Sequence, residues 1–74
     1  MSEQARFARF AARRSVGDVV DGEVVKAMPF GAFVRVDEVD GFLPEKPPPA
    51  VGAAVRVRVV AIDADQERFA VESV

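Results

Sequence analysis

The segment "PFGAFVRV", residues 29–36, holds two phenylalanines, Phe30 and Phe33, separated only by Gly31 and Ala32. The chain has six phenylalanines and no tryptophan or tyrosine, so these two rings are a large part of its aromatic surface. The small residues between them keep that surface low, which would allow a flat aromatic group to stack on each ring. Alternatively, one or both rings seal a hydrophobic core.

Side chains that carry common enzymatic chemistry are scarce. The sequence has no histidine and no cysteine, which removes the usual general base and the usual zinc ligands. The only hydroxyl side chains are Ser2, Ser15 and Ser73. No pair of nucleophile and base is apparent, so we expect a protein without catalytic activity, cofactor or metal.

The net charge of −2 conceals an asymmetry. Residues 1–15 carry four arginines and one glutamate, a charge of +3, whereas residues 16–74 carry six basic and eleven acidic side chains, a charge of −5. A basic arm is typical of contact with nucleic acid or an acidic partner, while an acidic body disfavours strong generic binding of polyphosphates. No apolar run is long enough for a membrane span or a secretory signal, so we expect a cytoplasmic protein.

The chain length allows one small domain. Residues 2–14 predict a helix with Ser2 as its N-cap, and Phe7 and Phe10 share one side of it. Such a helix would dock through these two rings or not at all. It has three interpretations: a frayed tail, a basic arm that contacts RNA, or an element that docks on another protein.

After residue 15, abundant valines favour strands. We expect strands at 18–28, 32–36, 41–44, 54–63 and 68–74, and a glycine inside the first, Gly22, predicts a bend or bulge. Alternation predicts that the core is faced by Val55, Val57, Val59, Phe69 and Val71, with Arg56 and Arg58 on the other side. Five short strands with long first and fourth members predict a small closed barrel, because closure removes exposed sheet edges.

Two segments carry a family resemblance. The segment "VGDVVDGEVVKAMPFGAFVRVDEVDGFLP", residues 16–44, resembles the start of the S1 RNA-binding motif, and "VGAAVRVRVVAIDADQERFAVES", residues 51–73, resembles its last two strands. The resemblance implies an all-β fold, a five-stranded OB-fold barrel of S1 type over residues 15–74. Residues 1–14 would form a basic helix or flexible tail before it. The chain departs from the family in its short, proline-rich connection between the third and fourth strands.

The resemblance also implies an RNA-binding site. Phe30 and Phe33 match the aromatic pair on the RNA face, and Pro44 stands where many members have a histidine. The polar pair that brackets the last turn is Asp63 and Arg68. The possible phosphate contacts are Lys26, Arg35 and Arg68. One further aromatic residue, Phe42, either extends the face or is buried.

Two functions follow from these patterns. The first is a monomeric, non-catalytic module that binds single-stranded RNA with low sequence specificity and acts in translation or RNA metabolism, with no membrane contact. The second is a protein-interaction module that docks on a ribosomal or transcription protein through the same face and the N-terminal arginine helix.

Overall fold

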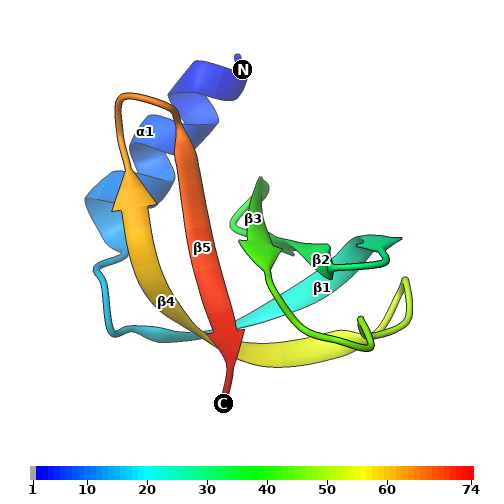
Figure 1. Ribbon diagram of the computed structural model, residues 1–74. Coiled ribbons are helices and arrows are strands. Elements are labelled where there is room, and N and C mark those ends of the chain that lie inside the picture. The colour runs from blue at the N-terminus through cyan, green and yellow to red at the C-terminus, as the bar shows by residue number, and fades with distance from the viewer. Residues whose placement is uncertain (1) are drawn as a thin grey trace.

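The computed structural model describes residues 2–74, so Met1 of the predicted 1–14 segment lies outside the described residues. One helix precedes five strands, as Figure 1 shows. The elements are α1 (Glu3–Arg13), β1 (Val19–Met28), β2 (Gly31–Val36), β3 (Val39–Leu43), β4 (Ala54–Asp63) and β5 (Arg68–Ser73). The strands form a closed barrel in the order β1-β2-β3-β5-β4, which confirms the predicted fold class.

β1 pairs with two strands, β4 and β2, and this double pairing helps the sheet curve into a closed barrel. Its first half pairs antiparallel with β4 and its second half with β2, and Glu23 has a partner in both strands. The register with β2 shifts between Val24 and Lys26, so the bulge lies a few residues beyond Gly22, the position predicted for it. Gly22 is needed for close approach instead, because an added Cβ would lie 2.5 Å from Cγ1 of Val34.

The hydrophobic core follows the predicted alternation of inward and outward side chains. Val57, Val59 and Val71 are fully buried and Phe69 is 4% exposed, while Val55 is partly buried against the core. Arg56 and Arg58, which alternate with the valines of β4, face solvent. A short parallel contact between β3 and β5 closes the barrel around this core. The complete set of buried apolar residues is Phe7, Phe10, Val20, Val24, Ala32, Val34, Val36, Leu43, Val57, Val59, Phe69 and Val71.

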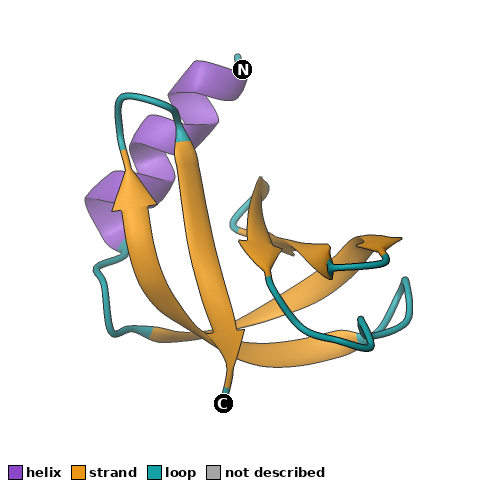
Figure 2. Ribbon diagram, viewed as in Figure 1, coloured by secondary structure: helices purple, strands orange, loops and turns teal. Residues whose placement is uncertain are grey.

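The helix closes one end of the barrel. Its first turn is capped by Ser2, whose hydroxyl accepts a hydrogen bond from the backbone N–H of Ala5 at 3.1 Å. Phe7 and Phe10 are both buried, and the ring of Phe10 stacks on that of Phe69 with centroids 4.1 Å apart. Figure 2 shows α1 beside the turn between β4 and β5, with the β3–β4 loop at the far end of the barrel. The two rings are thus buried within this chain, so neither a frayed tail nor docking on another protein through these rings, two of the three interpretations of the helix, fits the structure.

A charged contact fastens the end of the helix to the β2–β3 turn. Arg14, the C-cap residue, donates through Nε to Oδ2 of Asp37 at 2.8 Å. Asp37 and Glu38 form the two-residue turn and both have positive φ, 51° and 69°, a geometry that usually selects asparagine or glycine. The hydrogen bond from Arg14 lowers the pKa of Asp37. The helix and the hairpin therefore hold each other in place.

No helix in residues 2–74 combines the length and the apolar character that crossing a membrane would need.

Candidate nucleic-acid interface

A shallow groove lies on the outer face of β2 and β3. We call it the aromatic groove, and its lining residues are Met28, Phe30, Phe33, Asp40, Phe42, Arg68 and Phe69. Four of them were predicted as site residues from the sequence, namely Phe30, Phe33, Phe42 and Arg68. They come from the β1–β2 turn, β2, β3 and the start of β5, so only the closed barrel brings them together.

Three phenylalanine rings form an adjoining cluster in this groove. Phe42 lies between the other two, with centroid separations of 5.9 Å to Phe30 and 5.8 Å to Phe33. Phe30 is 57% exposed, and Phe33 and Phe42 are partly buried, so none of the three belongs to the fully buried core. The rings consequently offer accessible aromatic surface rather than sealing the barrel.

Strand alternation and a glycine create this arrangement. Val34 and Val36 of β2 point into the core, which directs Phe33 outward, and Phe33 stands directly opposite Phe42 on β3. Gly31 lets the strands approach closely at the end of the groove, because an added Cβ would lie 2.5 Å from the carbonyl oxygen of Leu43. Because Gly31 has no side chain and the backbones pack closely there, no side chain rises between the rings of Phe30 and Phe33 at this position.

Phe69 joins the core to the groove. Its ring lies over Gly41 of β3, so closely that an added Cβ at Gly41 would collide with three of its ring atoms. One face of the same ring stacks on Phe10 of the helix, and part of it lines the groove. The sequence predicted Phe69 as a core residue but carried no signal for its place in the groove lining, which depends on the contact between β3 and β5 that closes the barrel.

Asp40 was not predicted as part of the site. It stands opposite Arg35 across the β2–β3 hairpin, and Nε of Arg35 donates to Oδ1 of Asp40 at 2.9 Å. This hydrogen bond raises the pKa of Arg35, so the side chain stays charged while its charge is largely compensated. The pairing could have been foreseen only from a two-residue turn at Asp37 and Glu38, which fixes the register of the hairpin.

The other predicted site residues lie outside the groove lining. Lys26 is exposed on β1 opposite Phe33, and Pro44 is exposed just beyond the end of β3. Asp63 has a structural contact, because its Oδ1 accepts hydrogen bonds from the backbone N–H groups of Asp65 and Gln66, each at 3.1 Å. That carboxylate shapes the β4–β5 turn from which Arg68 enters the groove.

The arrangement suits non-covalent contact with a flat, anionic ligand. The groove offers ring faces together with one guanidinium, that of Arg68. In the part of the chain that the structure describes, no three histidine, cysteine, aspartate or glutamate side chains are placed to hold a metal ion.

Comparison with known proteins identifies the family. The model of the S1 RNA binding domain matches residues 14–47, which include Phe30, Phe33 and Phe42. The chain is 38% identical over 65 residues to the small ribosomal subunit protein bS1 homolog of Bacillus subtilis, a match of 73% of this chain and 17% of that protein. The chain belongs to the S1 domain family. This S1 domain is also 38% identical over 72 residues to the small ribosomal subunit protein bS1 of Mycobacterium leprae, covering 81% of this chain and 15% of that protein.

A solved structure shares the S1 fold. The solution structure of GSP13 from Bacillus subtilis superposes with a TM-score of 0.72 at 26% identity, over 81% of this chain and 55% of that one. The family resemblance expected from the sequence is thus confirmed. The chain spans 17% and 15% of the lengths of the two ribosomal relatives, so what those proteins do as a whole extends beyond this S1 domain.

Proposed function

We propose that this S1 domain is a non-catalytic module that binds single-stranded RNA in the aromatic groove and acts in translation or RNA metabolism in the cytoplasm. The observation that carries the proposal is the cluster of three accessible rings, Phe30, Phe33 and Phe42, beside the guanidinium of Arg68. Membership of a family described by RNA binding supports it, and so do relatives named as ribosomal proteins.

The proposed contact is dominated by stacking. Each base that stacks on an aromatic ring contributes roughly 1–3 kcal/mol, whatever its identity, because every base has a π face. Phenylalanine rings have no hydrogen-bonding groups that read base edges, so we expect low sequence specificity. The contact requires no second copy of the chain, so we expect a monomer.

Phosphate contacts are expected to be few. Arg68 lines the groove and Lys26 lies opposite Phe33, while Arg35 is paired with Asp40. For an RNA of about four nucleotides, which fills only the groove, about three phosphate contacts should make the logarithm of the binding constant fall against the logarithm of salt concentration with a slope near −2. A much steeper slope would contradict binding by stacking.

The direct test is a titration with a single-stranded RNA of about ten nucleotides at low salt, within the range of roughly 4–16 nucleotides that one OB-fold covers. Amide resonances recorded by NMR should shift at Phe30, Phe33, Phe42 and Arg68 and stay constant on the outer face of β4. Unchanged spectra at millimolar protein would refute RNA binding by this groove.

A second candidate function is protein interaction through the same groove. It is favoured by the acidic body of the domain and by Asp40 in the groove lining, since both repel phosphate. An apolar side chain of a ribosomal or transcription protein would then occupy the space between the rings. Binding to such a partner should survive ribonuclease treatment and be weakened by Phe30→Ala, whereas loss after ribonuclease treatment would contradict this function.

A further inference from the structure

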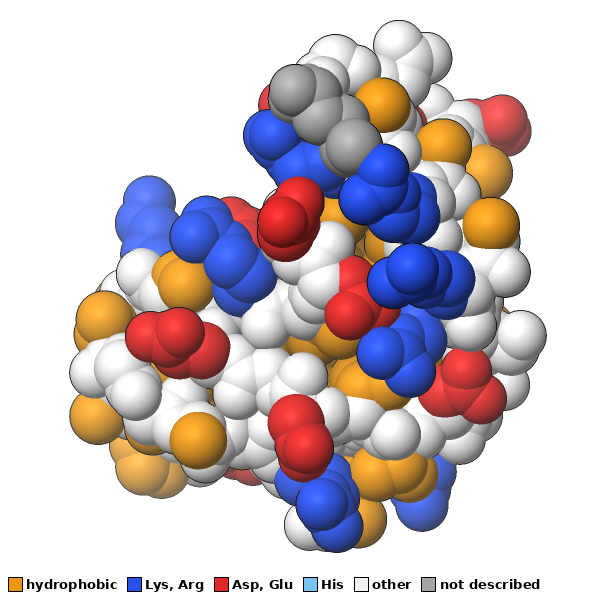
Figure 3. All heavy atoms as spheres, turned by 180° about the vertical axis from the view of Figure 1, so that it is seen from behind, with side chains coloured by type: hydrophobic (Ala, Val, Ile, Leu, Met, Phe, Trp, Pro, Cys, Tyr) orange, Lys and Arg blue, Asp and Glu red, His pale blue; other side chains and the backbone are white. Residues whose placement is uncertain are grey.

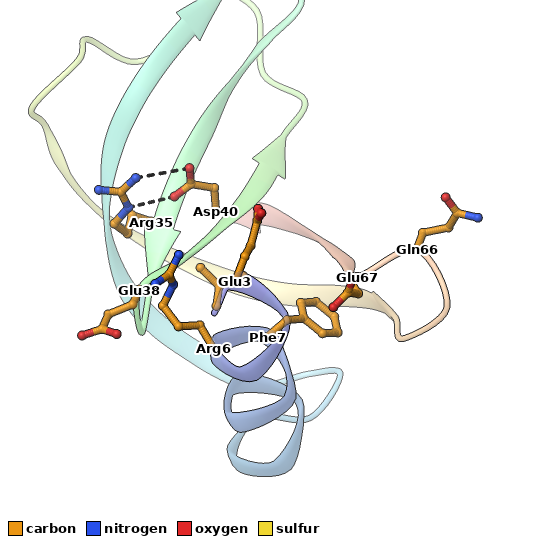
Figure 4. Close-up of a pocket in the computed structure, with 9 residues that line it drawn as sticks. Glu3, Arg6, Phe7, Arg35, Glu38, Asp40, Gln66 and Glu67 are labelled. Atoms are coloured by element: carbon orange, nitrogen blue, oxygen red, sulfur yellow. Dashed lines mark hydrogen bonds and ion pairs between the residues drawn. The ribbon is translucent and has the colours of Figure 1, made fainter. Parts of the chain in front are cut away.

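A second hollow extends the aromatic groove toward the helix. It shares Asp40 with the groove, and α1 contributes Glu3, Arg6 and Phe7 to its wall, as Figure 4 shows. In that view the side chain of Arg6 reaches from the helix toward the Arg35–Asp40 pair. An extended ligand that stacks on Phe30, Phe33 and Phe42 could therefore continue along a hollowed surface from β2 and β3 onto α1.

The path continues along one face of the helix. A further depression is lined by Arg6, Arg9 and Arg13 together with Asp37 and Glu38 of the β2–β3 turn. Spacings of three and four residues place the three arginines on the same side of α1, whereas Phe7 and Phe10 face the barrel. Figure 3 shows basic side chains in a row over this side of the molecule, with acidic side chains beside them.

Two of these arginines have charge available for a ligand. Arg9 and Arg13 are exposed, and within residues 2–74 neither forms an ion pair with a carboxylate. By contrast, Arg14 and Arg35 are engaged by Asp37 and Asp40. The two positive charges of Arg9 and Arg13 exceed the partial negative charge of about half a unit at the carboxyl end of α1, so this part of the helix surface can still attract an anion.

The pairing of Arg9 with Arg13 is unfavourable for the helix itself. Like charges four residues apart repel each other on a helix surface. Arg13 also has favourable electrostatics within the fold, because it lies in the last turn of α1 and contributes to lowering the pKa of Asp37. An anionic ligand along this face would relieve the repulsion between Arg9 and Arg13.

We propose that the arginine face of α1, Arg6, Arg9 and Arg13, is a second contact surface that holds the phosphate backbone of RNA leaving the aromatic groove. The inference rests on the proposed function, because the groove must hold the first bases. It gives the domain a bipartite site, in which stacking in the groove is followed by electrostatic contact on the helix. The intervening hollow is lined by four carboxylates, Glu3, Glu38, Asp40 and Glu67, against Arg6 and Arg35, so the phosphates are held on the helix and not in that hollow. The positive charge of the arginine face and the adjoining hollows that connect it to the groove select single-stranded RNA as the occupant.

RNA length separates the two parts of this site. Fluorescently labelled RNAs of about 4 and about 12 nucleotides, near the lower and upper parts of the range for one OB-fold, would be titrated with the wild type and with the double variant Arg9→Gln/Arg13→Gln. The matched control is Arg56→Gln/Arg58→Gln, which removes the same charge from the outer face of β4, where these arginines pair with Asp21 and Glu72.

The helix variant should bind the long RNA roughly tenfold or more weakly at about 50 mM salt, with a salt slope shallower by about 1.4, since each phosphate contact of a single strand contributes about −0.7. It should bind the short RNA like the wild type, and the β4 control should lose less than twofold for the long RNA. As an opposite test, Glu38→Gln removes an acidic side chain from the path and should tighten binding of the long RNA only.

Each contrary result has a distinct meaning. Equal losses for the helix variant and the β4 control would overturn the helix contact, because only net charge would matter. A helix variant with wild-type affinity and slope for the long RNA would overturn it as well, while leaving the groove intact. Failure of the wild type to bind the short RNA, with binding of the long RNA insensitive to Phe33→Ala, would instead refute the proposed function on which this inference rests.

Discussion

Replacing Phe33 by alanine should separate binding from stability. The ring of Phe33 is partly buried against Phe42 and borders an open groove, so its removal leaves no closed cavity. Fully burying a phenylalanine contributes about 1.5–3 kcal/mol, so we expect Phe33→Ala to cost about 1–2 kcal/mol of folding free energy. Loss of one stacked base should cost roughly 1–3 kcal/mol of binding, which corresponds to about 5- to 150-fold.

The comparison variant is Phe10→Ala, because Phe10 is fully buried and stacks on Phe69. A core phenylalanine lost to alanine costs about 3–5 kcal/mol, a large part of the roughly 4–11 kcal/mol expected for a domain of this length. Thermal melts should show Tm lowered by about 4–16 °C for Phe33→Ala and by at least about 12 °C, or no cooperative transition, for Phe10→Ala.

Fluorescence anisotropy with the ten-nucleotide RNA supplies the second readout for the folded variant. Loss of the cooperative transition in Phe33→Ala, as in Phe10→Ala, would show that the ring belongs to the core and would refute its place in an open groove. Folded Phe33→Ala with RNA affinity within twofold of the wild type would equally refute the stacking role.

Three further predictions concern single side chains. Because the pKa of Asp37 is lowered in the folded state, its ion pair with Arg14 adds folding stability above the unfolded-state pKa of about 3.9. This stability is lost as the pH falls through the lower folded-state pKa. Asp37→Asn should flatten that part of the curve of unfolding free energy against pH, measured by urea unfolding. Gly41→Ala should lower the free energy of unfolding by about 1–3 kcal/mol, because the added methyl group collides with the ring of Phe69, and should lower Tm accordingly. An unchanged melting curve would contradict the contact. Asp40→Asn should release the guanidinium of Arg35 from its ion pair and tighten RNA binding in anisotropy titrations. Weaker binding would instead show that Asp40 itself contacts the RNA.

Much of the fold was open to prediction because it rests on local patterns. Valines at alternate positions mark β4, and its predicted bounds, residues 54–63, agree with the structure. Ser2 before a run of alanine and arginine marks the start of α1, where it acts as the N-cap. Such patterns are legible because side-chain direction repeats every two residues in a strand and every 3.6 in a helix.

The candidate site was only partly predictable. The short spacing between Phe30 and Phe33, together with the family resemblance, indicates two of the rings from the sequence alone. The pairing of Arg35 with Asp40, which reduces the charge available to RNA, depends on the register of a hairpin. Asp63 and Arg68 bracket the β4–β5 turn as the resemblance implied and stand opposite each other across the two strands, but their side chains differ in use, since Asp63 binds backbone amides while Arg68 lines the groove.

The sequence by itself determined the barrel, its strands and the family, because alternation and motif order are local properties of the chain. Only the tertiary structure decided what the N-terminal helix does, since a stripe of two phenylalanines is compatible with docking or with a free tail. Burial of Phe7 and Phe10 against Phe69 settles that choice and turns the arginines outward beside the groove. The physical reason is that closure of the barrel creates the apolar surface that the helix covers, and no local pattern encodes a surface assembled from strands far apart in the chain.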